Sequence, residues 1–200
     1  MNMNMNIALP LEQTQPSLSS AGTILHNYKD LIVLFNATFT QTENTVLVRG
    51  DHEPIYTPAK SPQQHHQIVF AHGYFASALH EIAHWCIAGK QRRFLEDYGY
   101  WYSPDGRDVK QQTEFERVEV KPQAIEWAFS CASGKPFAVS TDNLNGAPAD
   151  AQGFQHAVKQ QVMFYLEWDF PPRAAEFIRV LQAFYQIDNL HRGMFDVESA

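Results

Sequence analysis

The stretch that most constrains the fold is residues 67–89, where a short apolar run leads through a glycine into a helical pattern. Residues 67–71, Gln-Ile-Val-Phe-Ala, are typical of a short buried strand. Gly73 separates this run from residues 75–88, whose apolar positions recur at helical spacing, and Gly89 supplies a helix end. A strand followed at once by a helix favours a fold that mixes a sheet with helices.

The rest of the chain predicts further elements around this stretch. Apolar spacing predicts helices over residues 24–39, 108–133, 154–168 and 172–186, the second of them interrupted or kinked near Pro122. Strands are expected at residues 45–49 and 97–102, and loops at residues 51–65 and 140–153. The predicted fold class is therefore α+β, a small sheet packed with several helices.

Length and composition predict one domain. The chain has 200 residues, of which 44% are hydrophobic and 18% charged, as in soluble globular proteins. Residues 1–22 are expected to be a disordered tail, because Met and Asn alternate there and Pro10 and Pro16 break any periodic pattern. Residues 23–190 are expected to form the single domain, followed by a C-terminal tail at residues 191–200.

Charge and the start of the chain limit the classes of function. The formal net charge of −7 argues against a nucleic-acid-binding surface, which needs clustered Lys and Arg. The basic run at residues 90–93 is either a small docking patch or, more simply, a solvated helix end. No basic leader precedes Lys29 and no apolar run near the start is long enough to span a membrane, so a cytoplasmic location is expected. Cys86 and Cys131 form no disulfide framework and are expected to be buried.

Residues 80–84, His-Glu-Ile-Ala-His, place two histidines four residues apart on the predicted helix. Residues at this spacing share one helix face, with Cβ atoms roughly 5–6 Å apart, so both imidazoles can bind one metal ion. Glu81 is rotated by about 100° from His80 and lies beside the ion, where it is the candidate catalytic residue for proton transfer. An apolar stripe would hold this helix in the core: Ala76, Leu79, Ala83 and Ile87. The simpler alternative is two surface histidines on an amphipathic helix.

Two histidines need a third ligand to complete a metal site. Glu119, which lies between two valines on the next long helix, is the favoured candidate. Glu116 and Glu126 are the alternatives, and Glu119 could also be an ordinary surface acid. His72 ends the strand before the metal helix and is a further candidate, although a structural histidine is the simpler interpretation.

Two histidines and one carboxylate suit two kinds of metalloenzyme. With zinc, the site would hydrolyse bonds and Glu81 would activate water, and the His-Glu-x-x-His pattern by itself favours this chemistry. With Fe(II), the same ligands leave positions open for oxygen and substrate. The His-x-Asp/Glu pattern of common 2-oxoglutarate oxygenases does not occur in the chain. A structural metal in a non-enzymatic domain would require a fourth ligand, which the sequence does not clearly offer.

Several long motifs resemble the elongation factor P hydroxylase family. They are residues 50–56, 68–89, 97–107 and 118–127. The resemblance extends over roughly residues 25–185 and leaves residues 1–22 outside.

This resemblance implies an oxidoreductase of the monooxygenase type that hydroxylates the β-lysylated lysine of translation elongation factor P. It implies a non-haem Fe(II) site with O₂ as co-substrate, and a fold like that of a small metal-dependent ribonuclease. By motif, His80 and His84 match the two histidine ligands and Glu119 the carboxylate. Glu81 would then orient a ligand, hold metal-bound water or pass protons to oxygen. The sequence does not identify the electron donor.

A β-lysyl-lysine arm is long and cationic, so it suits an acidic protein with a recessed metal. The aromatic residues expected to line a slot for the arm, unless they pack in the core, are Tyr98, Tyr100 and Trp101, with Tyr102 beside them. Asp105 is expected to pair with an ammonium group, and the other acids that could do so are Asp51, Glu53, Asp97 and Asp108. Arg107 is expected at the substrate or at the acidic partner protein, with Arg92 and Arg93.

Overall fold

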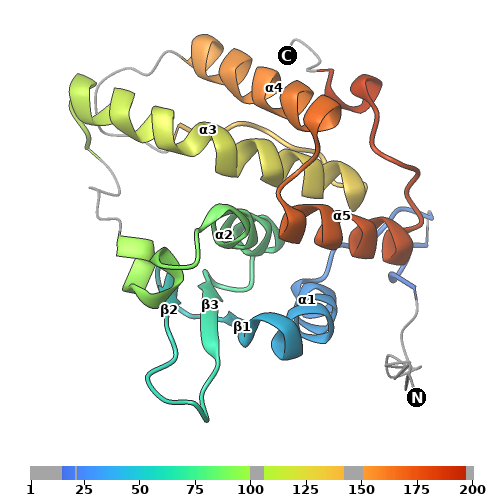
Figure 1. The fold of residues 1–200 in the computed structure, drawn as a ribbon. Helices are drawn as coiled ribbons and strands as arrows, with labels where there is room; N and C mark the ends of the chain where they lie inside the picture. Colours follow the sequence, from blue (N-terminus) through green and yellow to red (C-terminus); the bar gives the residue numbers. More distant parts are fainter. Residues whose placement is uncertain (1–14, 21, 100–105, 142–150, 197–200) are drawn as a thin grey trace.

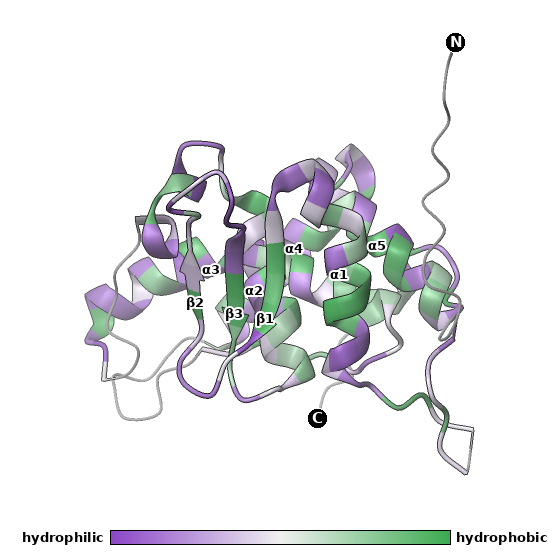
Figure 2. Cartoon of the chain, turned by 90° about the horizontal axis from the view of Figure 1, so that it is seen from below, coloured by the Kyte–Doolittle hydropathy of each residue, from purple (hydrophilic) through white to green (hydrophobic). Residues whose placement is uncertain are grey.

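Helix α2 (Phe75–Ile87) runs through the centre of the fold (Figure 1). Below it in that view lie the sheet and helix α1 (Tyr28–Glu43), and above it lie helices α3 (Val109–Ala132) and α5 (Pro172–Tyr185). Helix α4 (Ala151–Trp168) covers the outer side of α3. Seen from below, α1 lies next to the first strand, so that the strands and α1 form one layer under α2 (Figure 2).

The structure is a computed structural model that describes residues 15–20, 22–99, 106–141 and 151–196. Within these ranges it contains five α-helices and one three-stranded sheet, which confirms the predicted α+β class. The likeness to a ribonuclease fold stays a prediction. In the described parts, no helix combines the length and the apolar character needed to cross a membrane.

Because α2 is central, more of its surface is buried than the apolar stripe predicted from the sequence. A helix packed on one side buries one apolar face, whereas α2 contacts strand β3 on one side and α3 on the other. Seven of its residues are buried: Phe75, Ala78, Leu79, Ile82, Ala83, Trp85 and Cys86. Two residues of the predicted stripe, Ala76 and Ile87, are only partly buried. Polar side chains on such a helix need partners inside the protein.

The three strands are β1 (Thr45–Arg49), β2 (Ile55–Thr57) and β3 (His66–Phe70). Strand β3 lies in the middle, parallel to β1 and antiparallel to β2. Strand β2 falls in the segment that was predicted to be a loop. Prolines at positions 54 and 58 flank this strand, and they are tolerated because β2 is at the edge of the sheet.

The strand predicted at residues 97–102 is wrong where the structure describes it. Asp97, Tyr98 and Gly99 have φ angles of 45°, 57° and 72°, which form a left-handed turn at the end of the short helix η2 (Glu96–Gly99). The turn packs against β2 instead of adding a strand: the Asp97 carboxylate accepts a hydrogen bond from the Tyr56 backbone N–H at 2.8 Å, and the Tyr98 ring stacks on the Tyr56 ring at 4.4 Å. Residues 100–102 of the predicted strand lie outside the described residues.

Helix ends are set by capping side chains. Helix α1 begins at Tyr28 rather than near residue 24, because the Asn27 side chain accepts a hydrogen bond from the Lys29 N–H at 3.0 Å. Helix α3 begins after Asp108, which forms a reciprocal capping box with Gln111. The helix continues through Pro122, where an interruption or kink was predicted.

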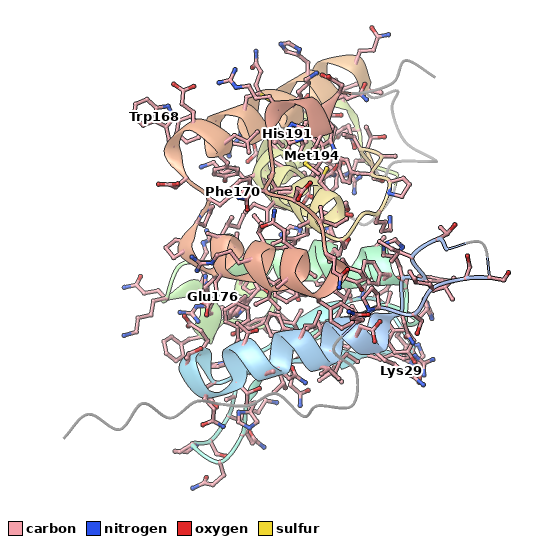
Figure 3. All side chains as sticks on the ribbon, turned by 90° about the vertical axis from the view of Figure 1, so that its right-hand side faces the viewer. Lys29, Trp168, Phe170, Glu176, His191 and Met194 are labelled. Carbon is pink, nitrogen blue, oxygen red and sulfur yellow. The ribbon has the colours of Figure 1, made fainter. Side chains whose placement is uncertain are left out.

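The domain extends beyond residue 190, where the C-terminal tail was predicted to begin. The short helix η3 (Arg192–Phe195) packs against α3 and α4, and Phe195 is fully buried with its ring 5.4 Å from that of Trp127. Met194 also lies against this part of the core (Figure 3). The burial of Phe195 therefore makes this segment part of the domain. Most of the expected N-terminal tail, residues 1–14 and 21, lies outside the described residues.

Both cysteines are free thiols; Cys86 is buried, as predicted, whereas Cys131 is only partly buried. Burial raises the pKa of Cys86 above its usual range and that of Cys131 to about 11. Because the thiolate is the reactive form, we expect neither cysteine to be alkylated by iodoacetamide at pH 8 in the folded protein. Mass spectrometry of the native and the urea-unfolded protein measures this, and both thiols should react after unfolding. Rapid alkylation of native Cys86 would contradict the prediction.

Candidate metal centre

Three side chains from two helices converge beside the middle of α2. The Nε2 atoms of His80 and His84 are 3.0 Å apart. Glu119 of α3 points between them, with Oε1 3.2 Å from His84 Nε2 and Oε2 3.6 Å from His80 Nε2. One ligand atom from each residue lies within 4.8 Å of the others. The spacing allows each atom to lie about 2.0–2.2 Å from one ion.

The state of Glu119 supports a cation at this point. Its side chain is 1% exposed, and the imidazoles of His84 and His80 face its carboxylate oxygens. Burial raises the pKa of Glu119, but the imidazoles of His84 and His80 outweigh that effect and bring the pKa to about 2. The group is therefore an anion at neutral pH, and a buried anion is costly unless a cation balances it. These residues fit a divalent metal.

The structure separates the three acids that were considered as third ligand. Glu119 alone joins the two histidine Nε2 atoms. Glu126 contacts the other nitrogen of His80, Nδ1, at 2.8 Å. Glu116 accepts a hydrogen bond from the Gln112 amide at 2.9 Å. The position favoured from the sequence is thus the one that faces both histidines, while the binding of a metal there stays a prediction.

Glu81, the candidate catalytic residue, lies beside this group and outside it. Burial raises the pKa of Glu81, His80 and His84 lower it, and the charges of Glu119 and Asp97 raise it further. Asp97 belongs to the same neighbourhood, and its pKa is also raised by burial, against a hydrogen bond from the Tyr56 backbone. The centre therefore has two further carboxyl groups close enough to interact electrostatically with the ligands.

A pocket of ≈ 480 Å³ opens next to His84. Its wall consists of His84, Ile87, Ala88, Gly89, Lys90, Gln91, Arg92 and Tyr98. Tyr98 is only 5% exposed, and its hydroxyl has no hydrogen-bond partner in the described part of the chain. Of the aromatic residues predicted to line a substrate slot, Tyr98 borders this pocket but packs in the core against the Tyr56 ring, which was the alternative considered for it.

Other predicted site residues lie elsewhere. Tyr100, Trp101 and Asp105 are outside the described residues. Arg107 is 1% exposed, so the contact with a partner protein that was considered for it is wrong: its guanidinium lies 3.7 Å from the Phe115 ring centre and donates hydrogen bonds to the Gln112 amide and the Thr141 carbonyl. These contacts tie the start of α3 to the segment at Thr141.

The remaining candidates either lie away from the ligand group or are paired with other residues of the chain. His72 is exposed, and its ring lies against Tyr74 rather than in the ligand group. In the basic run, Arg93 turns inward to Glu43 at 2.6 Å, and Arg92 donates to the Tyr98 carbonyl at 2.9 Å. These two arginines therefore stabilise the pocket wall instead of forming a free basic patch.

Sequence reasoning missed Arg173 of α5, which supports the end of the metal helix. Its guanidinium donates to the carbonyls of Ala88 at 2.7 Å and Cys86 at 3.1 Å, and it lies 4.4 Å from the Trp85 ring centre. A cation at the C-terminal end of a helix also interacts favourably with the helix dipole. No local pattern near position 173 points to this contact, because its partners are more than eighty residues earlier in the chain.

The chain resembles known proteins over most of its length. The chain is 50% identical over 173 residues to the elongation factor P lysine hydroxylase of Haemophilus influenzae, covering 86% of this chain and 97% of that protein. The sequence model described as elongation factor P hydroxylase matches residues 34–195, which include both helices of the candidate centre. The chain belongs to the elongation factor P hydroxylase family.

Proposed function

We propose that this protein is a non-haem iron enzyme that hydroxylates the β-lysylated lysine of elongation factor P. Family membership supports hydroxylation, and the relative from Haemophilus influenzae is named for that reaction on a lysine of this factor. The observation that carries the metal dependence is the buried Glu119 carboxylate, which faces the Nε2 atoms of both histidines. Two neutral imidazoles and one carboxylate are a ligand set that Fe(II) oxygenases use.

The ligands would hold the ion and leave coordination positions open. Bound Fe(II) would supply the activation of O₂ that an unactivated C–H bond requires. In the overall reaction one C–H becomes C–OH, one oxygen atom enters the product and the other leaves as water. Two protons and two electrons are consumed, the electrons coming from a donor outside the chain. Glu81, whose pKa is raised chiefly by burial, lies beside the ligands and is placed to deliver one of these protons.

The pocket beside His84 is the proposed place for the modified lysine arm. Ile87 and Tyr98 give it an apolar wall for the methylene groups. The Asp97 carboxylate supplies negative charge near the centre, which suits the ammonium groups of the arm.

The proposal is tested with β-lysylated elongation factor P as substrate. We expect protein reconstituted anaerobically with Fe(II), then given O₂ and ascorbate as the two-electron donor, to add one oxygen atom to the modified lysine. Tandem mass spectrometry with ¹⁸O₂ identifies the site and the source of the oxygen. Chelator-treated and zinc-loaded protein should give no product. Hydrolytic activity of the zinc form, with no oxygen incorporated by the iron form, would contradict the proposal and favour a zinc hydrolase.

A further inference from the structure

We propose that Glu126 is a positioning residue for the metal centre, which fixes the ring and the tautomer of His80; this role rests on the proposed metal dependence. Glu126 is seven residues beyond Glu119 on α3 and therefore lies on the same side of that helix. Its Oε2 is 2.8 Å from His80 Nδ1, and its side chain is only 14% exposed. A close, largely buried contact of this kind holds the ring in one orientation.

The contact determines which nitrogen of His80 faces the centre as a ligand. A neutral imidazole carries one N–H and one lone pair, and the partner of one nitrogen decides the state of the other. A carboxylate accepts hydrogen bonds, so Glu126 places the proton on Nδ1. The lone pair is then on Nε2, the atom that lies 3.6 Å from Glu119 and 3.0 Å from His84 Nε2. When metal binds, His80 therefore presents Nε2 as its ligand atom.

The position of Glu126 also excludes the ligand role considered for it from the sequence. The imidazole ring of His80 lies between Glu126 and the point where the ligand atoms converge. Glu126 therefore contributes charge without occupying a coordination position. A divalent ion, the Glu119 carboxylate and the Glu126 carboxylate sum to zero, which lowers the cost of an ion in this partly buried site.

The two histidines differ in how their Nδ1 atoms are held. Within the described residues, no hydrogen bond to His84 Nδ1 is found, whereas His80 is held at both ring nitrogens. His84 instead borders the pocket. The difference predicts that Glu126 acts on metal binding through His80 alone.

The hydrogen bond between Glu126 and His80 links α3 to α2 and could act only on the stability of the fold. The test must therefore separate an effect on stability from an effect on metal binding. We would titrate the metal-free protein with Co(II) and follow its visible absorption, which reports both affinity and ligand geometry. Glu126→Ala is expected to weaken Co(II) binding 10- to 100-fold and to change the spectrum. Glu126→Gln should lose less, about 3- to 10-fold, because its amide oxygen still accepts the Nδ1–H bond but carries no charge.

Matched controls make the result specific. Glu114→Ala removes an exposed acid of the same helix that pairs with Arg117, and it should bind Co(II) like the wild type. His80→Ala should lose the binding. The melting temperatures of the metal-free variants show whether a loss of affinity follows from a loss of folded protein.

The outcomes are distinguishable. If His80→Ala abolishes binding but both Glu126 variants bind within twofold of the wild type, the positioning role is overturned while the metal centre stands. If His80→Ala itself binds normally, the metal centre and the role of Glu126 both fail. If Glu126→Ala does not fold, the glutamine variant, which has nearly the same shape, decides the question by the same twofold criterion.

Discussion

Replacing Glu119 with glutamine is expected to abolish metal binding and hydroxylation while the metal-free protein still folds. The amide is neutral and nearly the same size, so packing on α3 is kept while the only anionic ligand is lost. Removing a partner that merely orients a ligand costs 10- to 100-fold in metal affinity, and removing the ligand itself should cost more than about 100-fold. Activity should fall to the level of the chelator-treated enzyme.

The stability of the metal-free variant is a separate expectation. In the metal-free protein the lowered pKa of Glu119 means that the folded state favours its anion beside His84 and His80, so the neutral amide should lower the melting temperature modestly. Calorimetry with and without Fe(II) measures both effects, because an ion that binds only the folded state raises the melting temperature of the wild type alone. Glu116→Gln is the control and should keep the metal response. A metal-dependent rise that persists in Glu119→Gln would show that Glu119 is not a ligand.

Replacing Trp85 with alanine is expected to give the largest loss of stability, about 3–5 kcal/mol. Trp85 is fully buried in α2, and its ring lies 5.1 Å from that of Phe35 and 4.9 Å from that of Phe39. Truncation would leave a cavity between α1 and α2 and would remove the surface on which Arg173 rests. Urea unfolding of the metal-free protein, followed by circular dichroism, measures the change in the free energy of unfolding.

The chain offers a matched control in a second tryptophan. Trp168 lies at the end of α4 with 68% of its surface exposed, at the outer edge of the molecule (Figure 3). Trp168→Ala should change the free energy of unfolding by less than about 0.5 kcal/mol. A loss below about 1 kcal/mol for Trp85→Ala would show that the core closes around the missing ring.

The sequence predicted the metal helix well because local signals mark both of its ends. Gly73 and Gly89 bracket it, and the helix found, Phe75–Ile87, differs by one residue from the predicted range. Glu119 could also be singled out, since it is an acid between valines on a long helix. Its approach to both histidines depends on how α2 packs against α3, and no local sequence pattern predicts that packing.

Elements that depend on distant contacts could not be predicted. Strand β2 has three residues, too few for an alternating pattern, and it exists because it pairs with β3. Arg107 looked like a surface residue after a turn, yet Phe115, Gln112 and Thr141 together satisfy it in the interior. Glu126 carried a visible signal, its helical spacing from Glu119, but only the orientation of His80 shows which side of the ring it contacts.

The left-handed turn at residues 97–99 has a consequence for how this family can evolve. Each non-glycine residue in that conformation costs roughly 1–2 kcal/mol, and asparagine, aspartate and glycine bear it best. A side chain at Gly99 would bring a Cβ within 2.8 Å of Leu95 Cδ1. Natural variation at position 97 should therefore be confined to Asp, Asn and Gly, with β-branched residues missing. Backbone geometry therefore limits which residues can occupy this turn, whatever chemical role their side chains have.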